Sequence, residues 1–187
     1  SKTLFLPDGA FASQLIELSV ENASALYANV RGTVPATPTG LAYDTFVASF
    51  FSVFNADPSL FGFSAHAYDA GWLAITGAAW SRFQEGGEVN GLGIARGLRR
   101  ISLGTEYDTG PNDWNSVRAA FSTGESVNLT GASGALDYDT LTGETSAPVN
   151  VWTISEDGSG GYELEVLYCV DLSPVPSPDC TEAGGTR

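Results

Sequence analysis

Hydrophobic positions recur every three or four residues through the middle of this chain, and the period shortens after Gly124. The apolar side chains at positions 43, 46, 47, 50, 51 and 54 have the spacing of one helical face. Thr39 and Asn112 are the expected N-caps of the first and last long helices. Similar spacing predicts the remaining helices over Ser64–Arg82, Ile94–Ile101 and Trp114–Phe121, and a brief one over Ser13–Leu18.

Shorter apolar runs, bounded by glycine and proline, predict strands near both ends of the chain. These runs are Lys2–Leu6, Val30–Val34, Val127–Thr130, Ala135–Tyr138, Val149–Ile154 and Tyr162–Val170. Two strands at the start and two at the end therefore enclose a mostly helical middle. We expect two structural units, with the chain crossing between them at Arg31–Thr39 and again at Ser146–Pro148.

The composition excludes several classes of protein. The chain has 187 residues, with 8 Lys and Arg against 22 Asp and Glu, so its formal net charge is -14. This charge argues against nucleic acid and anionic membrane surfaces as partners, because both are bound through basic patches. A hydrophobic content of 43% argues against intrinsic disorder, and no apolar run approaches the roughly 18 residues that a membrane helix needs. The chain contains no Met, so we expect Ser1 to lie downstream of the translational start.

The two cysteines, Cys169 and Cys180, flank a stretch rich in proline and serine. Neither has a second Cys or a His at the spacing of metal ligands, so no zinc site is expected. A disulfide is the favoured interpretation, with two unrelated thiols as the alternative. Closing this short loop would stabilise the fold by roughly 3 kcal/mol in the chain-entropy model, and it implies an oxidising compartment.

Three further patterns match known sites only loosely. Residues 91–97 (GLGIARG) lack the last spacing and the preceding strand of a dinucleotide-binding loop, so we expect small residues that allow close helix packing. The acidic pair Asp137 and Asp139 lacks the other ligands of a calcium loop, which favours a hairpin turn; a hydrolase using either carboxylate is the least favoured function. His66, the single histidine, has no nucleophile motif beside it, which argues against a catalytic triad.

Asp8 is the strongest candidate for a binding residue. It follows an apolar strand on a Pro-Asp-Gly turn, and ligands of α/β proteins are commonly held at the carboxyl ends of strands. The alternative is an aspartate that bonds only to the backbone of its own turn.

Several segments together resemble the branched-chain amino-acid receptor family, the type I periplasmic solute-binding proteins of ABC transporters. They occur in the order that this family uses in its C-terminal half. The segments are FLPDGAF (5–11), VRGTVPATPTGLAYDTF (30–46), FSAHAYDAGWLAITGA (63–78), GPNDW (110–114), LTGASGALDYDTLTGE (129–144) and VNVWTIS (149–155).

The resemblance implies a periplasmic-binding-protein-like two-lobed α/β fold of type I, present as an incomplete C-terminal fragment. Residues 1–33 would belong to the second lobe, residues 34–147 would complete the first lobe, and residues 148–187 would return to the second lobe with a disulfide-held tail. The N-terminal half of the same protein would be missing.

The resemblance also implies a ligand site. In amino-acid-binding members an acidic residue on the matching turn pairs with the ligand's ammonium group, and Asp8 falls there, although many members carry Glu. A buried ammonium needs such a carboxylate partner. Gly9 would allow close approach, Phe11 would wall the cleft, and Phe63 aligns where an aromatic ring can face the ligand.

These features lead to one expected function and one close alternative. We expect an extracytoplasmic component that binds an amino acid or related small solute by hinge closure and delivers it to an ABC permease, without catalysis, cofactor or metal. Its expected location is periplasmic or extracellular, either free or lipid-anchored in the full-length protein. The alternative is a ligand-sensing receptor ectodomain of the same fold that takes no part in transport.

Overall fold

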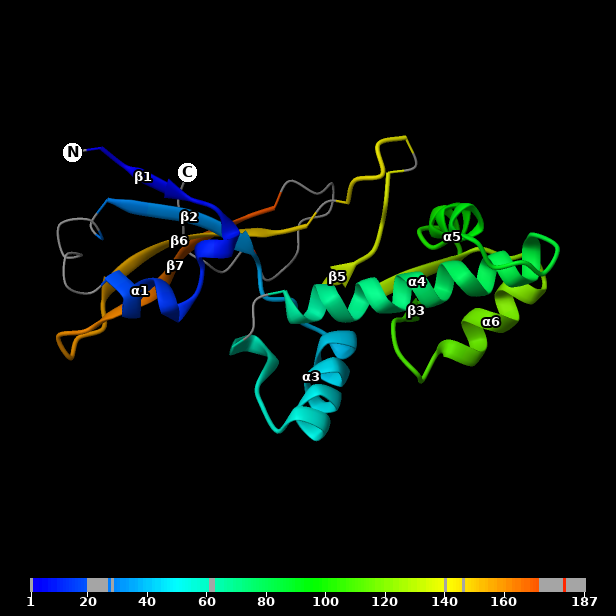
Figure 1. Cartoon of the computed structure of the whole chain (residues 1–187), viewed down its shortest axis with the longest axis horizontal. Coiled ribbons are helices and arrows are strands. Elements are labelled where there is room, and N and C mark those ends of the chain that lie inside the picture. The colour runs from blue at the N-terminus through cyan, green and yellow to red at the C-terminus, as the bar shows by residue number, and fades with distance from the viewer. Residues whose placement is uncertain are drawn as a thin grey trace. The chain divides into compact units, whose positions relative to one another are not determined.

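In the computed structural model the chain divides into two units, which are described separately (Figure 1). Unit 1 comprises Ser1–Ala36 and Ser146–Arg187, and unit 2 comprises Thr37–Thr145. The structure describes residues 2–19, 27, 29–60, 63–139, 141–145, 147–171 and 180. Ser146, at the second expected crossing, and most of the expected tail after Asp171 lie outside the described residues.

Unit 1 contains a four-stranded sheet in the order β1-β2-β6-β7. Its strands are β1 (Leu4–Leu6), β2 (Val30–Pro35), β6 (Val149–Glu156) and β7 (Tyr162–Val170). Strands β1 and β2 are parallel, and the other pairs are antiparallel. A one-turn 3-10 helix, η1 (Asp8–Ala10), and the helix α1 (Ser13–Ser19) follow β1. The core gathers around Trp152 of β6, with partly buried side chains from η1 and α1 packed against it.

Unit 2 is mostly helical, as the apolar periodicity indicates. Its helices are α3 (Leu41–Phe54), α4 (Ser64–Gln84), α5 (Gly91–Gly97) and α6 (Trp114–Ser122), with 3-10 turns η3 (Pro58–Leu60) and η4 (Leu98–Arg100). A small sheet joins β3 (Thr105–Asp108), β4 (Val127–Gly131) and β5 (Gly134–Ala135); the β3–β4 pair is parallel and the β4–β5 pair antiparallel. The main core packs α6 against β4 through Phe121 and Val127, both fully buried.

Helices α4 and α5 approach each other closely because small residues face one another. A Cβ atom added at Gly97 would lie 2.8 Å from the carbonyl oxygen of Gly77, so neither position accepts a larger side chain without movement. The expectation of close helix packing at residues 91–97 is confirmed.

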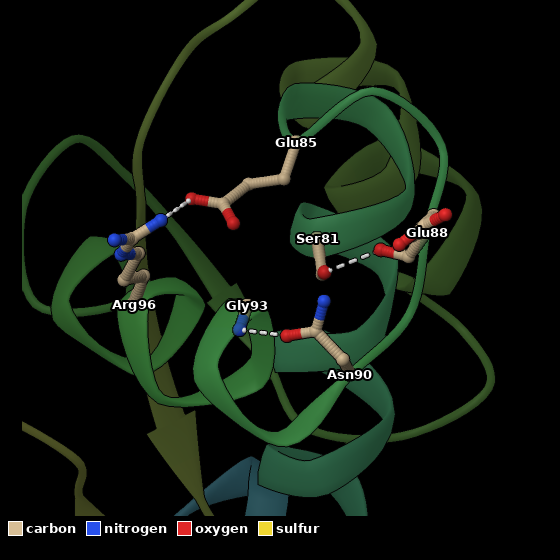
Figure 2. A network of polar contacts seen from close by, with 6 residues as sticks. All are labelled: Ser81, Glu85, Glu88, Asn90, Gly93 and Arg96. Atoms are coloured by element: carbon tan, nitrogen blue, oxygen red, sulfur yellow. Dashed lines mark hydrogen bonds and ion pairs between the residues drawn. The ribbon is translucent and has the colours of Figure 1, made fainter.

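Polar contacts hold the connection between these two helices (Figure 2). Asn90 is the N-cap of α5, and its side chain accepts a hydrogen bond of 2.8 Å from the Gly93 amide. The Ser81 hydroxyl donates to the Glu88 carbonyl at 2.8 Å, and Arg96 pairs with Glu85 at 2.7 Å. The ion pair is solvent-exposed, so it contributes at most about 1 kcal/mol.

The structure confirms an α/β protein and a disulfide between Cys169 and Cys180. Both N-cap predictions were wrong: α3 begins after Gly40 rather than Thr39, and α6 begins after Asp113 rather than Asn112. The strand predicted from Ala135 to Tyr138 is shorter, and β3 was not predicted.

Candidate functional site

The turn after β1 carries the predicted binding residue Asp8. The Ala10 amide donates to the Pro7 carbonyl at 3.0 Å, and the Phe11 amide donates to the Asp8 carbonyl at 2.9 Å, which closes the turn. The Asp8 side chain is exposed, and its Oδ1 accepts a hydrogen bond of 2.7 Å from the Gly9 amide. Oδ2 has no hydrogen-bond partner among the described residues. Oδ1 therefore makes the bond within its own turn that the alternative interpretation predicts.

The other two predicted residues of this turn have different surroundings. Gly9 is exposed with open space around its Cα, so nothing within the described chain requires a glycine there. Phe11 is half-buried, and its ring meets the indole of Trp152 edge-on at a centroid distance of 5.4 Å. Phe11 therefore packs into the core of unit 1 while its backbone closes the Asp8 turn.

Phe63 lies in unit 2, whereas Asp8 lies in unit 1. Phe63 precedes α4 with φ of 65°, a left-handed conformation that is uncommon outside glycine. The residue is 42% exposed, and its ring contacts His66 at a centroid distance of 5.5 Å. The structure thus brings three of the four predicted binding residues together, as neighbours along one turn.

Trp152 is a residue beneath this turn that sequence reasoning missed. It is fully buried on β6, opposite Gly32 of β2, and a Cβ added at Gly32 would lie 2.7 Å from the indole nitrogen. The indole therefore occupies the space that a side chain at Gly32 would need. Within the described part of the chain its Nε1–H has no hydrogen-bond partner, and leaving such a donor buried costs about 1–3 kcal/mol. A glycine inside a predicted strand was the available signal, since such glycines often mark a close approach.

Asp69 of α4 is the buried carboxylate of unit 2, 2% exposed. It accepts four hydrogen bonds of 2.6–2.9 Å: one from the Thr109 hydroxyl, one from the Ala132 amide, and two from the amide and hydroxyl of Ser133. The neighbouring Gly131 leaves room for the carboxylate. These bonds tie α4 to the β4–β5 turn, which gives Asp69 a structural role.

Asp139 of unit 2 serves a turn. Asp139 Oδ1 accepts from the amides of Leu141 and Thr142 at 2.7 and 3.1 Å, and a bridge joins Tyr138 to Thr145, so the expected hairpin turn is confirmed. In the part of the chain that the structure describes, no group of three or more His, Cys, Asp or Glu side chains could hold a metal ion.

Asp108 ends β3 in acidic surroundings. Its backbone amide donates to the Asp113 carboxylate at 2.9 Å. Partial burial, and then the charges of Asp113 and Glu106, raise the pKa of the Asp108 carboxyl above its ordinary value. This crowding is a local electrostatic cost in unit 2.

Comparison with known proteins identifies no relative. The chain matches no protein-family model, and neither the curated proteins nor the solved structures gave a match. None of the helices in the described ranges is long and apolar enough to cross a membrane.

Proposed function

We propose that this chain is the C-terminal portion of a type I solute-binding protein that serves an ABC transporter. It would bind an amino acid or a related small solute between two lobes, and hinge closure would trap the solute. The N-terminal half of the same protein and a membrane permease are the proposed partners. The disulfide supports an exported protein in the periplasm or outside the cell, because such bonds persist in oxidising compartments.

The Asp8 turn is the observation that carries this proposal. A carboxylate stands exposed at the carboxyl end of a strand in a parallel pair, with Oδ1 oriented by the Gly9 amide. Such a carboxylate can accept a hydrogen bond from the ammonium group of a solute. Hydrogen bonds between two charged groups are among the stronger ones in proteins.

The organisation of the chain gives independent support. Unit 1 is built from two stretches that are separated by the whole of unit 2, which fits a chain that leaves one lobe, completes another and returns. The segments that carry the family resemblance follow the same order along the chain.

The two parallel pairs support the idea that further strands belong to each unit. Among the described residues β1 pairs only with β2, and β3 pairs only with β4. Parallel strands are normally buried inside a sheet. Here Phe5 of β1 is 64% exposed and Leu4 is 40% exposed. The proposed N-terminal half would add strands at these edges.

Calorimetric titration of the full-length protein against the twenty L-amino acids tests the proposal. We expect at least one to bind, and Asp8→Ala to weaken its affinity by about 10- to 100-fold, as expected for a lost charged hydrogen bond. Asp8→Asn keeps the shape and removes the charge, so it should weaken binding nearly as much.

Asp157→Ala is the matched control, because this aspartate also sits exposed on a turn of unit 1. The affinity of the Asp157→Ala variant for the amino acid should equal that of the wild type. Unchanged affinity in Asp8→Ala would remove Asp8 from the site, and the absence of binding by every amino acid would contradict the proposed substrate class.

A further inference from the structure

Trp152 reaches the Asp8 turn through a short chain of contacts. Its ring lies over Gly32, and Gly32 pairs with Leu6, two residues before Asp8. The ring of Phe11 then rests against the indole, with an interplanar angle of 62°. Phe11 is the C-cap of η1, and its amide holds the Asp8 carbonyl.

The turn is anchored to the core of unit 1 through Ala10 and Phe11, both of which pack against the cluster that contains Trp152. Asp8 and Gly9 are exposed, and among the described residues the Asp8 side chain bonds only to the Gly9 amide, its neighbour in the turn. Of the two anchoring residues Phe11 makes the aromatic contact, and its ring packs edge-on against Trp152 directly after the turn. A smaller ring at position 152 would leave a gap over Gly32 into which Phe11 can move.

The surroundings of the Trp152 Nε1–H argue against a hydrogen bond as the reason for an indole at this position. A buried tryptophan normally finds an acceptor for its N–H group, and this one has none among the residues that the structure describes. No hydrogen bond made by the indole therefore explains its placement, and the shape that it presents to Gly32 and Phe11 does.

We propose that Trp152 is the positioning residue of the Asp8 turn, which fixes the Asp8 carboxylate through Phe11; its bearing on ligand affinity rests on the proposed solute-binding function. A ligand need not touch the indole for this role. Altering the ring should loosen the turn locally and change how well the carboxylate meets a solute ammonium.

Amide hydrogen exchange in the full chain tests this role without a ligand. In Trp152→Phe the amides of Ala10 and Phe11 should exchange at least tenfold faster, while the β6–β7 ladder stays as protected as in the wild type. A purely structural role would accelerate the ladder as well. Phe11→Leu removes the ring contact from the other side and should give the same local effect.

Trp114→Phe is the matched control, since it makes the same replacement in unit 2 and should leave Ala10 and Phe11 unaffected. Unchanged exchange at these two amides in both test variants, or equal acceleration of the ladder, would overturn the proposal.

Affinity for the amino acid that binds best in the titration separates the two ideas. Trp152→Phe should weaken it at least threefold. If no amino acid binds the wild type, the proposed function fails, and the exchange result still decides whether Trp152 positions the turn. If the turn loosens and affinity does not change, the link from Trp152 to recognition is overturned while the proposed function stands.

Discussion

Asp69 in unit 2 and Trp152 in unit 1 are both buried side chains that carry a polar group, but their polar groups have opposite surroundings. In unit 2 the Asp69 carboxylate accepts four hydrogen bonds, so its burial is compensated. In unit 1 the Trp152 indole N–H is buried with no hydrogen-bond partner among the described residues, and packing holds the ring. Hydrogen bonds therefore fix the Asp69 carboxylate, whereas close packing fixes the Trp152 indole. The two should therefore respond differently to substitution.

Asp69→Ala should produce the largest effect. The substitution leaves the Thr109 hydroxyl and the amides of Ala132 and Ser133 without their acceptor in a buried place. We expect a loss of about 3 kcal/mol or more in the free energy of unfolding, because each buried unpaired donor is costly. Urea unfolding followed by tryptophan fluorescence measures it, since three of the four tryptophans lie in unit 2.

Asp44→Ala provides the control for that measurement. Asp44 is an exposed aspartate in the first turn of α3, where it gains only the favourable interaction with the helix N-terminus. Its removal should cost less than about 1 kcal/mol. Similar losses for Asp69→Ala and Asp44→Ala would mean that the buried bonds do not stabilise unit 2.

The glycines beside the two buried groups give the next largest effect. A Cβ at Gly131 would lie 2.6 Å from the Asp69 Cγ, and a Cβ at Gly32 would lie 2.7 Å from the Trp152 Nε1. Both alanine variants should be destabilised by about 1–3 kcal/mol through overpacking. Gly131→Ala should lie at the upper end, because the bonded carboxylate cannot shift without losing its donors. Thermal unfolding of each variant measures the difference.

Gly71→Ala is the control for these two variants. Gly71 is exposed within α4, and a Cβ there would meet nothing within 4 Å. Alanine should therefore stabilise the helix by about 0.5–1 kcal/mol. A larger loss of stability in Gly32→Ala than in Gly131→Ala would contradict the comparison. It would mean that hydrogen bonds hold the Asp69 carboxylate no more firmly than packing holds the Trp152 indole.

The smallest effect concerns Asp108, at the partly buried end of β3 in unit 2. Because the folded-state pKa of Asp108 lies above its ordinary value of 3.8, folding favours the protonated carboxyl. The stability that this preference contributes is complete below 3.8 and is lost as the pH rises through the folded-state pKa. Asp108→Asn should therefore raise the unfolding temperature at pH 7, with a gain of less than about 1 kcal/mol in the free energy of unfolding. At pH 3 the same substitution should give no gain.

Asp157 in unit 1 should show the opposite sign. The Ser159 amide, followed by its hydroxyl and the Gly161 amide, lowers the pKa of the Asp157 carboxyl. Its contribution to stability is present above the ordinary pKa and is lost as the pH falls through the lowered value. Asp157→Asn should thus lower the unfolding temperature at pH 7. A gain at pH 7 in this variant would contradict the assigned hydrogen bonds.

Local patterns predicted most of the elements. Strand β7 has the bounds that alternating residues indicated, Tyr162–Val170, and the predicted helix Ser64–Arg82 extends only to Gln84. The missed strand β3 has the sequence TEYD, in which polar side chains dominate, and its first two residues are exposed. Without apolar alternation, the tendency of a short segment to pair is not visible in its own residues.

The sequence predicted only those parts of the site whose residues are close together along the chain. The Asp8 turn follows its strand as the Pro-Asp-Gly segment indicated. The partners of Asp69 are 40 to 64 residues away along the chain, so no local pattern assigns them. The contact between Trp152 and Phe11 similarly joins opposite ends of the sequence. Tertiary packing alone creates these contacts.

The disulfide has a covalent consequence that is independent of any fold. Cys169 and Cys180 are 11 residues apart, and no Lys or Arg lies between them. If a protease cuts any peptide bond inside that ring, the two pieces remain one molecule that is heavier by a single water. A reducing agent then releases the C-terminal piece. Electrophoresis with and without reductant therefore reports whether the ring has been opened.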